Sequence, residues 1–271
     1  MPLDTRLGQE IFWQQIGHGP RPALAIHCTL GASQLWAPVL EPLGDQITAT
    51  LFDQPNHGRS AGWDATEAEA GAFQRLVTQI AASFIDRPVD LLGHSFGASV
   101  ALRIAVAAPE AVRSLTLVEP VLFAALPDTH PEWQALRAKQ DHLEQMIAEG
   151  NLERAAAAFM HDWGAGAPWE TLPEHQRARF IQQMPMVGNI SSANFEDPGG
   201  IAREGGMETI DAPVLIVHGD SSPPIMPHVA EAIAARLQDV GTACVPGAGH
   251  MLPVTHQAQL TELIALNLER S

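Results

Sequence analysis

The apolar residues of this chain fall into short, wholly apolar runs, separated by longer segments with apolar positions three or four residues apart. The short runs predict buried strands over residues 23–28, 47–52, 89–92, 115–118, 214–217 and 243–245. The spaced positions predict helices over residues 66–85, 98–107, 227–237 and 256–270. Gly8 and Gly17 indicate turns between earlier strands. Strands that are apolar throughout and alternate with helices are typical of an α/β fold, with a parallel sheet covered on both faces.

Residues 130–205 interrupt this alternation with one long stretch of mixed helical character that holds three of the six tryptophans. We predict that a helical lid, residues 125–206, is inserted between the two halves of one core, residues 1–124 and 207–271. Four apolar side chains of this lid either line the roof of a pocket or pack the lid onto the core: Phe159, Met160, Trp163 and Trp169.

Charge and composition exclude several classes of partner. The 271 residues include 15 basic and 31 acidic side chains, for a formal net charge of −16, so binding to nucleic acid or to an anionic membrane surface is disfavoured. No apolar stretch reaches the roughly 20 residues of a membrane helix, and residues 1–4 show no secretory signal. We therefore expect a cytoplasmic protein.

Counts of single residue types narrow the chemistry. Without tyrosine, the chain cannot hold the Tyr/Lys dyad of short-chain dehydrogenases. Its one lysine, Lys139, follows Ala138, which excludes a phosphate loop of the Gly-Lys type. Cys28 and Cys244 form neither a disulfide framework nor a cysteine zinc cluster, and no H-E-x-x-H motif occurs. We predict no cofactor and no metal site.

The segment with the clearest chemical meaning is the G-x-S-x-G motif formed by Gly93, Ser95 and Gly97. It follows a predicted strand and opens a predicted helix, as a nucleophile elbow requires. A serine at such a sharp turn projects clear of the sheet, and the helix N-terminus favours negative charge beside it. The alternative is a glycine-lined turn that carries a surface serine.

A serine nucleophile needs an adjacent base. In this motif's fold the triad runs in the order serine, acid, histidine, so the base is expected near the end of the chain. His250 lies there, in the glycine-rich stretch 245–253 just before the last predicted helix. We predict that His250 is the base; the alternative is a solvent-exposed loop histidine.

Together these segments resemble the α/β-hydrolase fold superfamily over essentially the whole chain, in the manner of a serine esterase or lactonase with a helical lid. The resemblance rests on residues 27–31 (HCTLG), 53–60 (DQPNHGRS), the elbow at Ser95, and 247–250 (GAGH). It implies that the amides of Thr29 and Phe96 form the oxyanion hole. Cys28 stands where the family usually has glycine, whose freer backbone permits a close approach. Asp53 and Arg59 are implied to hold their loop, without a catalytic role.

The triad acid has two candidates. The family most often carries it in a G-x-x-D pattern after the strand that follows the lid, but here that position is Ser222, and Asp220 is only one residue past Gly219. A second family location is the end of the strand after the nucleophile helix, where Glu119 lies. A glutamate that emerges from a buried strand is costly unless it is paired, which favours Glu119 over Asp220.

The predicted function is a serine hydrolase that cleaves a small carboxylic ester, lactone or thioester through an acyl-enzyme. Carbon–carbon bond hydrolysis and enol-lactone hydrolysis are alternatives within the same fold. A ligand-binding protein that has lost catalysis is a third, suggested by Cys28 and the displaced acid. Haloalkane dehalogenases and epoxide hydrolases of this fold use an aspartate at the elbow, so Ser95 disfavours those activities.

Overall fold

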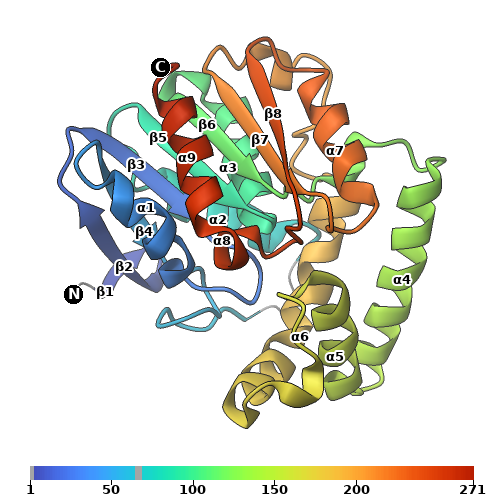
Figure 1. Cartoon of the computed structure of the whole chain (residues 1–271). Helices are drawn as coiled ribbons and strands as arrows, with labels where there is room; N and C mark the ends of the chain where they lie inside the picture. Colours follow the sequence, from blue (N-terminus) through green and yellow to red (C-terminus); the bar gives the residue numbers. More distant parts are fainter. Residues whose placement is uncertain (1–2, 65–68) are drawn as a thin grey trace.

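An eight-stranded sheet forms the centre of the computed structural model, which describes residues 3–64 and 69–271 (Figure 1). The strands lie in the order β1-β2-β4-β3-β5-β6-β7-β8. Their bounds are Leu3–Arg6, Gln9–Gly17, Arg21–Ile26, Ile47–Phe52, Val89–His94, Val112–Val118, Val214–Gly219 and Val240–Val245 for β1 to β8. In this order, the neighbouring strands from β4 to β8 pair in parallel, whereas the β1–β2 and β2–β4 pairs at one edge are antiparallel. The mostly parallel α/β sheet expected from the apolar runs is confirmed.

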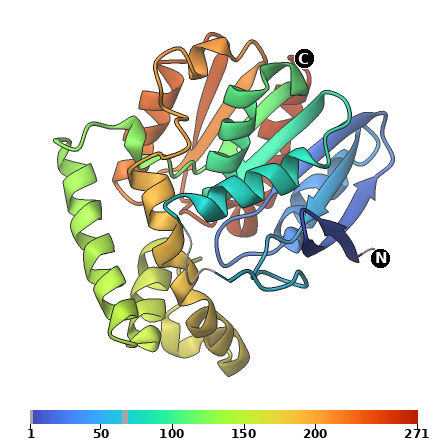
Figure 2. The same cartoon turned by 180° about the vertical axis from the view of Figure 1, so that it is seen from behind.

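Helices cover both faces of the sheet, which is why the central strands are apolar on both sides (Figures 1 and 2). One face is covered by α2, α3 and α7, with bounds Ala72–Ala82, Phe96–Ala107 and Ile225–Ala234. The other is covered by α1, α8 and α9, with bounds Ala37–Leu40, Leu252–Thr255 and Gln257–Leu268. Each face has its own buried apolar cluster.

Three further helices lie between β6 and β7 in the sequence and extend to the lower right of the sheet in Figure 1. They are α4, α5 and α6, with bounds Pro131–Ala148, Leu152–Trp163 and Glu174–Phe195. We call residues 131–195 the helical insertion. Its helices pack on a small cluster that includes Leu143, Met146 and Met184, and Leu30 of the core joins this cluster. In the described ranges, no helix is both long and apolar enough to cross a membrane.

The structure differs from the sequence pattern mainly at element ends and at the first strands. The helix predicted over residues 66–85 begins at Ala72, after Gly71 adopts a φ of 71°; residues 66–68 lie outside the described part of the chain. The long stretch 130–205 resolves into three helices, and α6 continues through Pro185. β1 and β2 lacked a wholly apolar run because they form an edge hairpin, with several side chains exposed.

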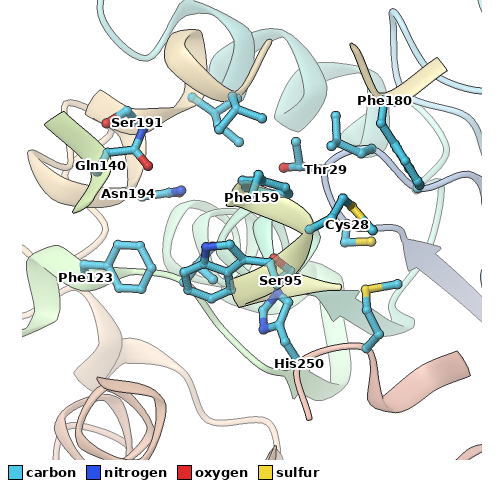
Figure 3. Close-up of a pocket in the computed structure, with 18 of the residues that line it drawn as sticks. Cys28, Thr29, Ser95, Phe123, Gln140, Phe159, Phe180, Ser191, Asn194 and His250 are labelled. Atoms are coloured by element: carbon cyan, nitrogen blue, oxygen red, sulfur yellow. The ribbon is translucent and has the colours of Figure 1, made fainter. Parts of the chain in front are cut away.

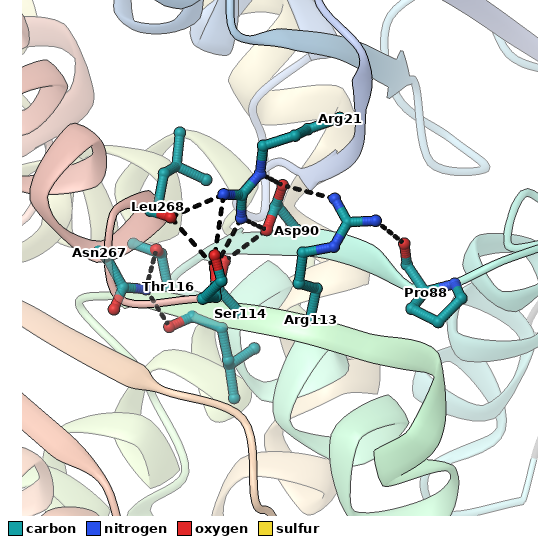
Figure 4. Close-up of polar contacts among 10 residues, drawn as sticks. Arg21, Pro88, Asp90, Arg113, Ser114, Thr116, Asn267 and Leu268 are labelled. Carbon is teal, nitrogen blue, oxygen red and sulfur yellow. Dashed lines mark hydrogen bonds and ion pairs between the residues drawn. The ribbon is translucent and has the colours of Figure 1, made fainter.

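A buried ion pair fastens α9 to the end of the sheet at which β3 and β5 begin (Figure 4). Arg21 binds both carboxylate oxygens of Asp90, at 2.9 and 2.7 Å, and donates to the carbonyl of Leu268 at 2.7 Å. Ser114 donates to the same carboxylate at 2.8 Å, and Arg113 lies 3.6 Å from it. Asp90 is 1% exposed, so these contacts provide the pairing that a buried charge requires.

Candidate active site

The turn between β5 and α3 holds Ser95 in a strained conformation, with φ 57° and ψ −119°. The two glycines of the motif have no room for a side chain, because backbone carbonyl oxygens lie too close to them. A Cβ on Gly93 would lie 2.3 Å from the carbonyl oxygen of Gly97, and one on Gly97 would lie 2.3 Å from that of Ile26. The amide of Ser95 donates to the carbonyl of Val118 at 2.8 Å, which ties the turn to β6.

Three buried side chains form a continuous hydrogen-bonded chain at the carboxyl ends of the strands. Nε2 of His250 lies 2.9 Å from the hydroxyl oxygen of Ser95, and Nδ1 of His250 lies 3.0 Å from Oε2 of Glu119. The other carboxylate oxygen of Glu119 accepts from the amide of Gly219 and from the hydroxyl of Ser222, each at 2.7 Å. The structure therefore brings together the serine, histidine and glutamate that the sequence singled out. Their catalytic role stays a prediction, taken up below.

The carboxylate of Glu119 is stabilised in its charged form. Burial raises its pKa, but the hydrogen bond and the charge of His250, with the hydrogen bonds from Ser222 and Gly219, together outweigh burial, and the pKa lies below its ordinary value. When the imidazole of His250 is neutral, an ionised acceptor on Nδ1 places the ring proton there, which leaves Nε2 unprotonated and facing Ser95. This is the tautomer that a base for the serine hydroxyl needs.

Asp220, the other candidate acid, has a different position. One of its carboxylate oxygens accepts from the amide of Gly247 at 2.7 Å and from the hydroxyl of Ser221 at 3.0 Å. These bonds fix the start of the loop that leads to His250. The contact with His250 is instead made by Glu119. Ser222, three residues after Gly219, occupies the position at which the family most often has the acid, and its hydroxyl donates to Glu119.

His94, next to Ser95 in the elbow, holds the loop that carries His250. Its Nε2 donates to the backbone carbonyl of His250 at 2.8 Å, so His94 positions His250 without a hydrogen bond to the serine hydroxyl. The two imidazole rings lie 5.3 Å apart. Burial, followed by the charge of His250, lowers the pKa of His94 to about 3, so His94 is neutral at physiological pH.

The loop after β3 is pinned to the loop after β4 by buried polar contacts. The amide of Leu30 donates to Nε2 of His57 at 3.0 Å, and the amide of Ser33 donates to Asp53 at 2.7 Å. Asp53 also accepts from the amide of Arg59 at 2.9 Å, a contact that fits the structural role implied for this pair. These contacts hold residues 30–33 against residues 53–59.

Within this loop, the amide of Thr29 has no acceptor among the described residues, and the same is true of Phe96 at the start of α3. Cys28 does not require the backbone freedom of the glycine that the family usually has there. The left-handed conformation occurs at Leu30, with φ 61°, and Cys28 is absent from the positive-φ positions of the described chain. Burial raises the pKa of the Cys28 thiol to about 12, so it remains protonated.

A cavity of about 260 Å³ opens above Ser95 and His250, between the core and the helical insertion (Figure 3). Its walls are mostly apolar. Phe159, Met160 and Trp163 of the insertion line it, which is the first of the two roles that the sequence left open for them, lining a pocket or packing onto the core. Trp169 is not part of this lining: it packs against the cluster inside the insertion, because it lies in the α5–α6 connection. Within residues 3–64 and 69–271, no group of three or more His, Cys, Asp or Glu side chains could hold a metal ion.

A sheet of this topology, with a strained serine between β5 and α3, defines an α/β hydrolase. The chain belongs to the alpha/beta hydrolase family, whose model matches residues 23–263. It is 34% identical over 202 residues to the pimeloyl-[acyl-carrier protein] methyl ester esterase of Klebsiella pneumoniae subsp. pneumoniae, covering 74% of this chain and 70% of that protein. The esterase of the same name from Proteus mirabilis is 24% identical, over 96% of this chain and 97% of its own length.

Solved structures show the same fold at lower sequence identity. MGS-M2, an alpha/beta hydrolase enzyme from a Medee basin deep-sea metagenome library, superposes with a TM-score of 0.75 at 16% identity. The match covers 100% of this chain and 98% of that one. The resemblance to the α/β-hydrolase superfamily that the sequence motifs indicated is thereby confirmed.

Proposed function

We propose that this protein is a serine hydrolase that cleaves a carboxylic ester, lactone or thioester of a small, largely apolar substrate through an acyl-enzyme intermediate. The observation that carries the proposal is the chain of hydrogen bonds from Ser95 through His250 to Glu119, at 2.9 and 3.0 Å, beneath an apolar cavity. The curated relatives named as methyl ester esterases support ester hydrolysis in particular.

In the first half of the reaction, the hydroxyl oxygen of Ser95 attacks the substrate carbonyl carbon. His250 takes the hydroxyl proton on Nε2 and becomes a cation, which the adjacent carboxylate of Glu119 stabilises. The oxyanion that forms is bound by the amides of Thr29 and Phe96. When the carbonyl re-forms, the bond to the alcohol breaks and His250 returns the proton to the departing oxygen, which leaves an ester on Ser95.

In the second half, water repeats the same steps in the place of Ser95. His250 removes a proton from the water, the resulting hydroxide attacks the acyl carbon, and the proton passes to the Ser95 oxygen as the acid product leaves. Glu119 remains ionised throughout, because its role is to orient and stabilise the imidazole. The pKa of Glu119 below its ordinary value suits this role.

The helical insertion would act as the lid of this site. Its residues Phe159, Met160 and Trp163 line the cavity, and the ring of Trp163 meets the ring of His250 edge-on at 4.7 Å. An apolar roof favours uncharged acyl groups and excludes bulk water from the reacting atoms. The predicted lid boundaries, residues 125–206, remain part of this proposal.

The test is the turnover of p-nitrophenyl acetate and p-nitrophenyl butyrate by the wild type and three variants. We expect Ser95→Ala to lose about 10⁴-fold or more of the rate. Glu119→Gln should lose about 10³–10⁴-fold, because the amide favours the wrong histidine tautomer. Asp220→Asn is the matched control. It makes the same carboxylate-to-amide change, keeps an acceptor for Gly247, and should stay within about tenfold of the wild type.

Labelling of Ser95 by a fluorophosphonate separates the alternatives. Ester turnover with Ser95 labelling supports the hydrolase. Labelling of Ser95 without turnover of either ester would favour carbon–carbon bond or enol-lactone hydrolysis, which use the same nucleophile. An inert protein whose Ser95 also resists the probe would refute the triad and favour the ligand-binding alternative. If Asp220→Asn collapsed instead of Glu119→Gln, the assignment of the acid would be wrong.

A further inference from the structure

One corner of the cavity is polar, although the rest of its lining is mainly apolar. Gln140 of α4 and the two α6 residues Ser191 and Asn194 line this corner. Figure 3 shows the three side chains together on one side of the cavity, with Cys28 and Phe180 on the opposite side. None of the three takes part in the hydrogen-bonded chain at Ser95. We call this group the polar corner.

Like Ser191, Asn194 is a buried member of the polar corner. Its residue is 8% exposed, and its Oδ1 atom is buried without a hydrogen-bond partner in the described part of the chain. In Figure 3 its amide nitrogen points into the cavity. Because a buried amide without partners is unfavourable, and because rotation exchanges its two ends, the side chain is available to a ligand as donor or as acceptor.

Each of the other two members already makes one hydrogen bond to a neighbouring side chain. Nε2 of Gln140 donates to Glu144 at 3.0 Å, which leaves the carbonyl end of its amide as an acceptor. The hydroxyl oxygen of Ser191 accepts from Arg137 at 3.3 Å, which leaves the hydroxyl proton to be donated. The polar corner therefore offers both donors and an acceptor within one small region.

The charge behind the polar corner disfavours an anionic ligand there, although Arg179 lines the same cavity beside Phe180 on the opposite side. Arg137 is the nearest cation, and it is neutralised by Asp141, at 2.7 Å, and by Glu144, at 3.3 Å, while its guanidinium stacks 4.9 Å from the ring centre of Phe195. One positive and two negative side chains leave a local charge of −1. A carboxylate would meet this negative charge and the acceptor of Gln140, whereas a neutral group that both donates and accepts would be satisfied.

We propose that the polar corner is a specificity subsite for a neutral hydrogen-bonding group, a hydroxyl or a carboxamide, at the end of the substrate remote from the scissile bond. The proposal rests on the proposed function, since it assigns a substrate class to the same cavity. The preferred substrates are then esters that are apolar near the scissile bond and carry a hydroxyl or carboxamide at the far end.

The test compares matched esters that differ only in the far end, which is a methyl, hydroxyl, carboxamide or carboxylate group. One series carries this group on the acyl chain of a p-nitrophenyl ester, and a second carries it on the alcohol of an acetate ester, followed by proton release. In one of the two series we expect kcat/KM for the hydroxyl or carboxamide ester to exceed that of the carboxylate ester by about tenfold or more. No such preference in either series would overturn the proposal.

Variants tie the preference to the polar corner. Asn194→Leu and Gln140→Leu should each lower the ratio of carboxamide to methyl turnover by about tenfold, because each leaves a buried polar group of the substrate unpaired. Gln134→Leu is the matched control on the same helix, since Gln134 is exposed and does not line the cavity. An unchanged ratio in both Leu variants, or an equal fall in the control, would contradict the proposal.

A charge variant gives an independent readout. Glu144→Gln removes one of the two carboxylates on Arg137 and should raise turnover of the carboxylate ester relative to the carboxamide ester by several-fold. If the ratio did not move, the charge argument would be wrong. If no ester in either series were hydrolysed, the proposed function would fail first. Calorimetric binding of the carboxamide-ended and carboxylate-ended alcohols to Ser95→Ala would then test the subsite alone, with equal affinities overturning it.

Discussion

Two buried neutral histidines should make the folded protein sensitive to mild acid. Burial, followed by repulsion from His27, lowers the pKa of His57 to about 3, and burial, followed by His250, lowers that of His94 to about 3. The hydrogen bonds of His57 explain why its neutral form is required. Nδ1 donates to the carbonyl of Pro55 at 2.8 Å, and Nε2 accepts the amide of Leu30, so a second ring proton would face an N–H group.

The magnitude follows from the difference between the folded and unfolded states. In the unfolded chain these histidines titrate near 6.5, so below that pH the unfolded state binds more protons than the folded state, and stability falls as pH falls. At 1.36 kcal/mol per pKa unit, each histidine removes about 2 kcal/mol between about pH 7 and about pH 5, and the pair removes about 4 kcal/mol. That is a large share of the roughly 5–15 kcal/mol that stabilises a typical protein.

Urea unfolding at the two pH values measures this loss directly. His57→Gln tests the assignment, because a glutamine amide can also donate to Pro55 and accept from Leu30 but does not titrate. It should lose about 2 kcal/mol less than the wild type over this range. His175→Gln is the control, since His175 is exposed, and it should match the wild type. Equal pH dependence in His57→Gln and the wild type would refute the reasoning.

Two further predictions concern hydrogen bonds to buried carboxylates. Arg21→Met leaves Asp90 with Arg113 and Ser114 alone and should lower the free energy of unfolding in urea by about 1.5–3 kcal/mol; a change below about 0.5 kcal/mol would contradict the role of Arg21 in this ion pair. Ser222→Ala removes a hydrogen bond that lowers the pKa of Glu119. Relative to the wild type, kcat should therefore fall more at acid pH than at neutral pH, and a uniform fall would argue against this coupling.

Much of the core could be predicted because its strands are apolar on both faces and short. The run 47–52 coincides with β4, and the run 89–92 lies within β5. The hairpin of β1 and β2, at one edge of the sheet, gave no such run, since several of its side chains are exposed. The break between α4 and α5 was equally hard to locate, because both helices carry apolar residues toward one shared cluster.

The candidate site also contains residues that the sequence could predict and residues that it could not. Ser95 and His250 were found because their spacing constraints are local: two glycines around the serine, and a glycine-rich loop before the last helix. Glu119 was favoured over Asp220 by the cost of burying an unpaired charge, and it is the one that contacts His250. The polar corner had no local signal, since Gln140 and Asn194 lie 54 positions apart in the sequence and only the packing of α4 against α6 brings them together.

Because of where the helical insertion lies, the residues proposed to set substrate specificity can change independently of the residues proposed to carry out the reaction. β6 and β7 are neighbours in the sheet, so the chain leaves the core and re-enters it at adjacent strands. Segments of different length and sequence can therefore be exchanged at this point while the sheet keeps its register. Ser95, Glu119 and His250 all lie outside the insertion, whereas all three residues of the polar corner lie inside it. Recombination at this junction is thus a direct route to new substrates with Ser95, Glu119 and His250 retained, and a practical site for building chimeric proteins.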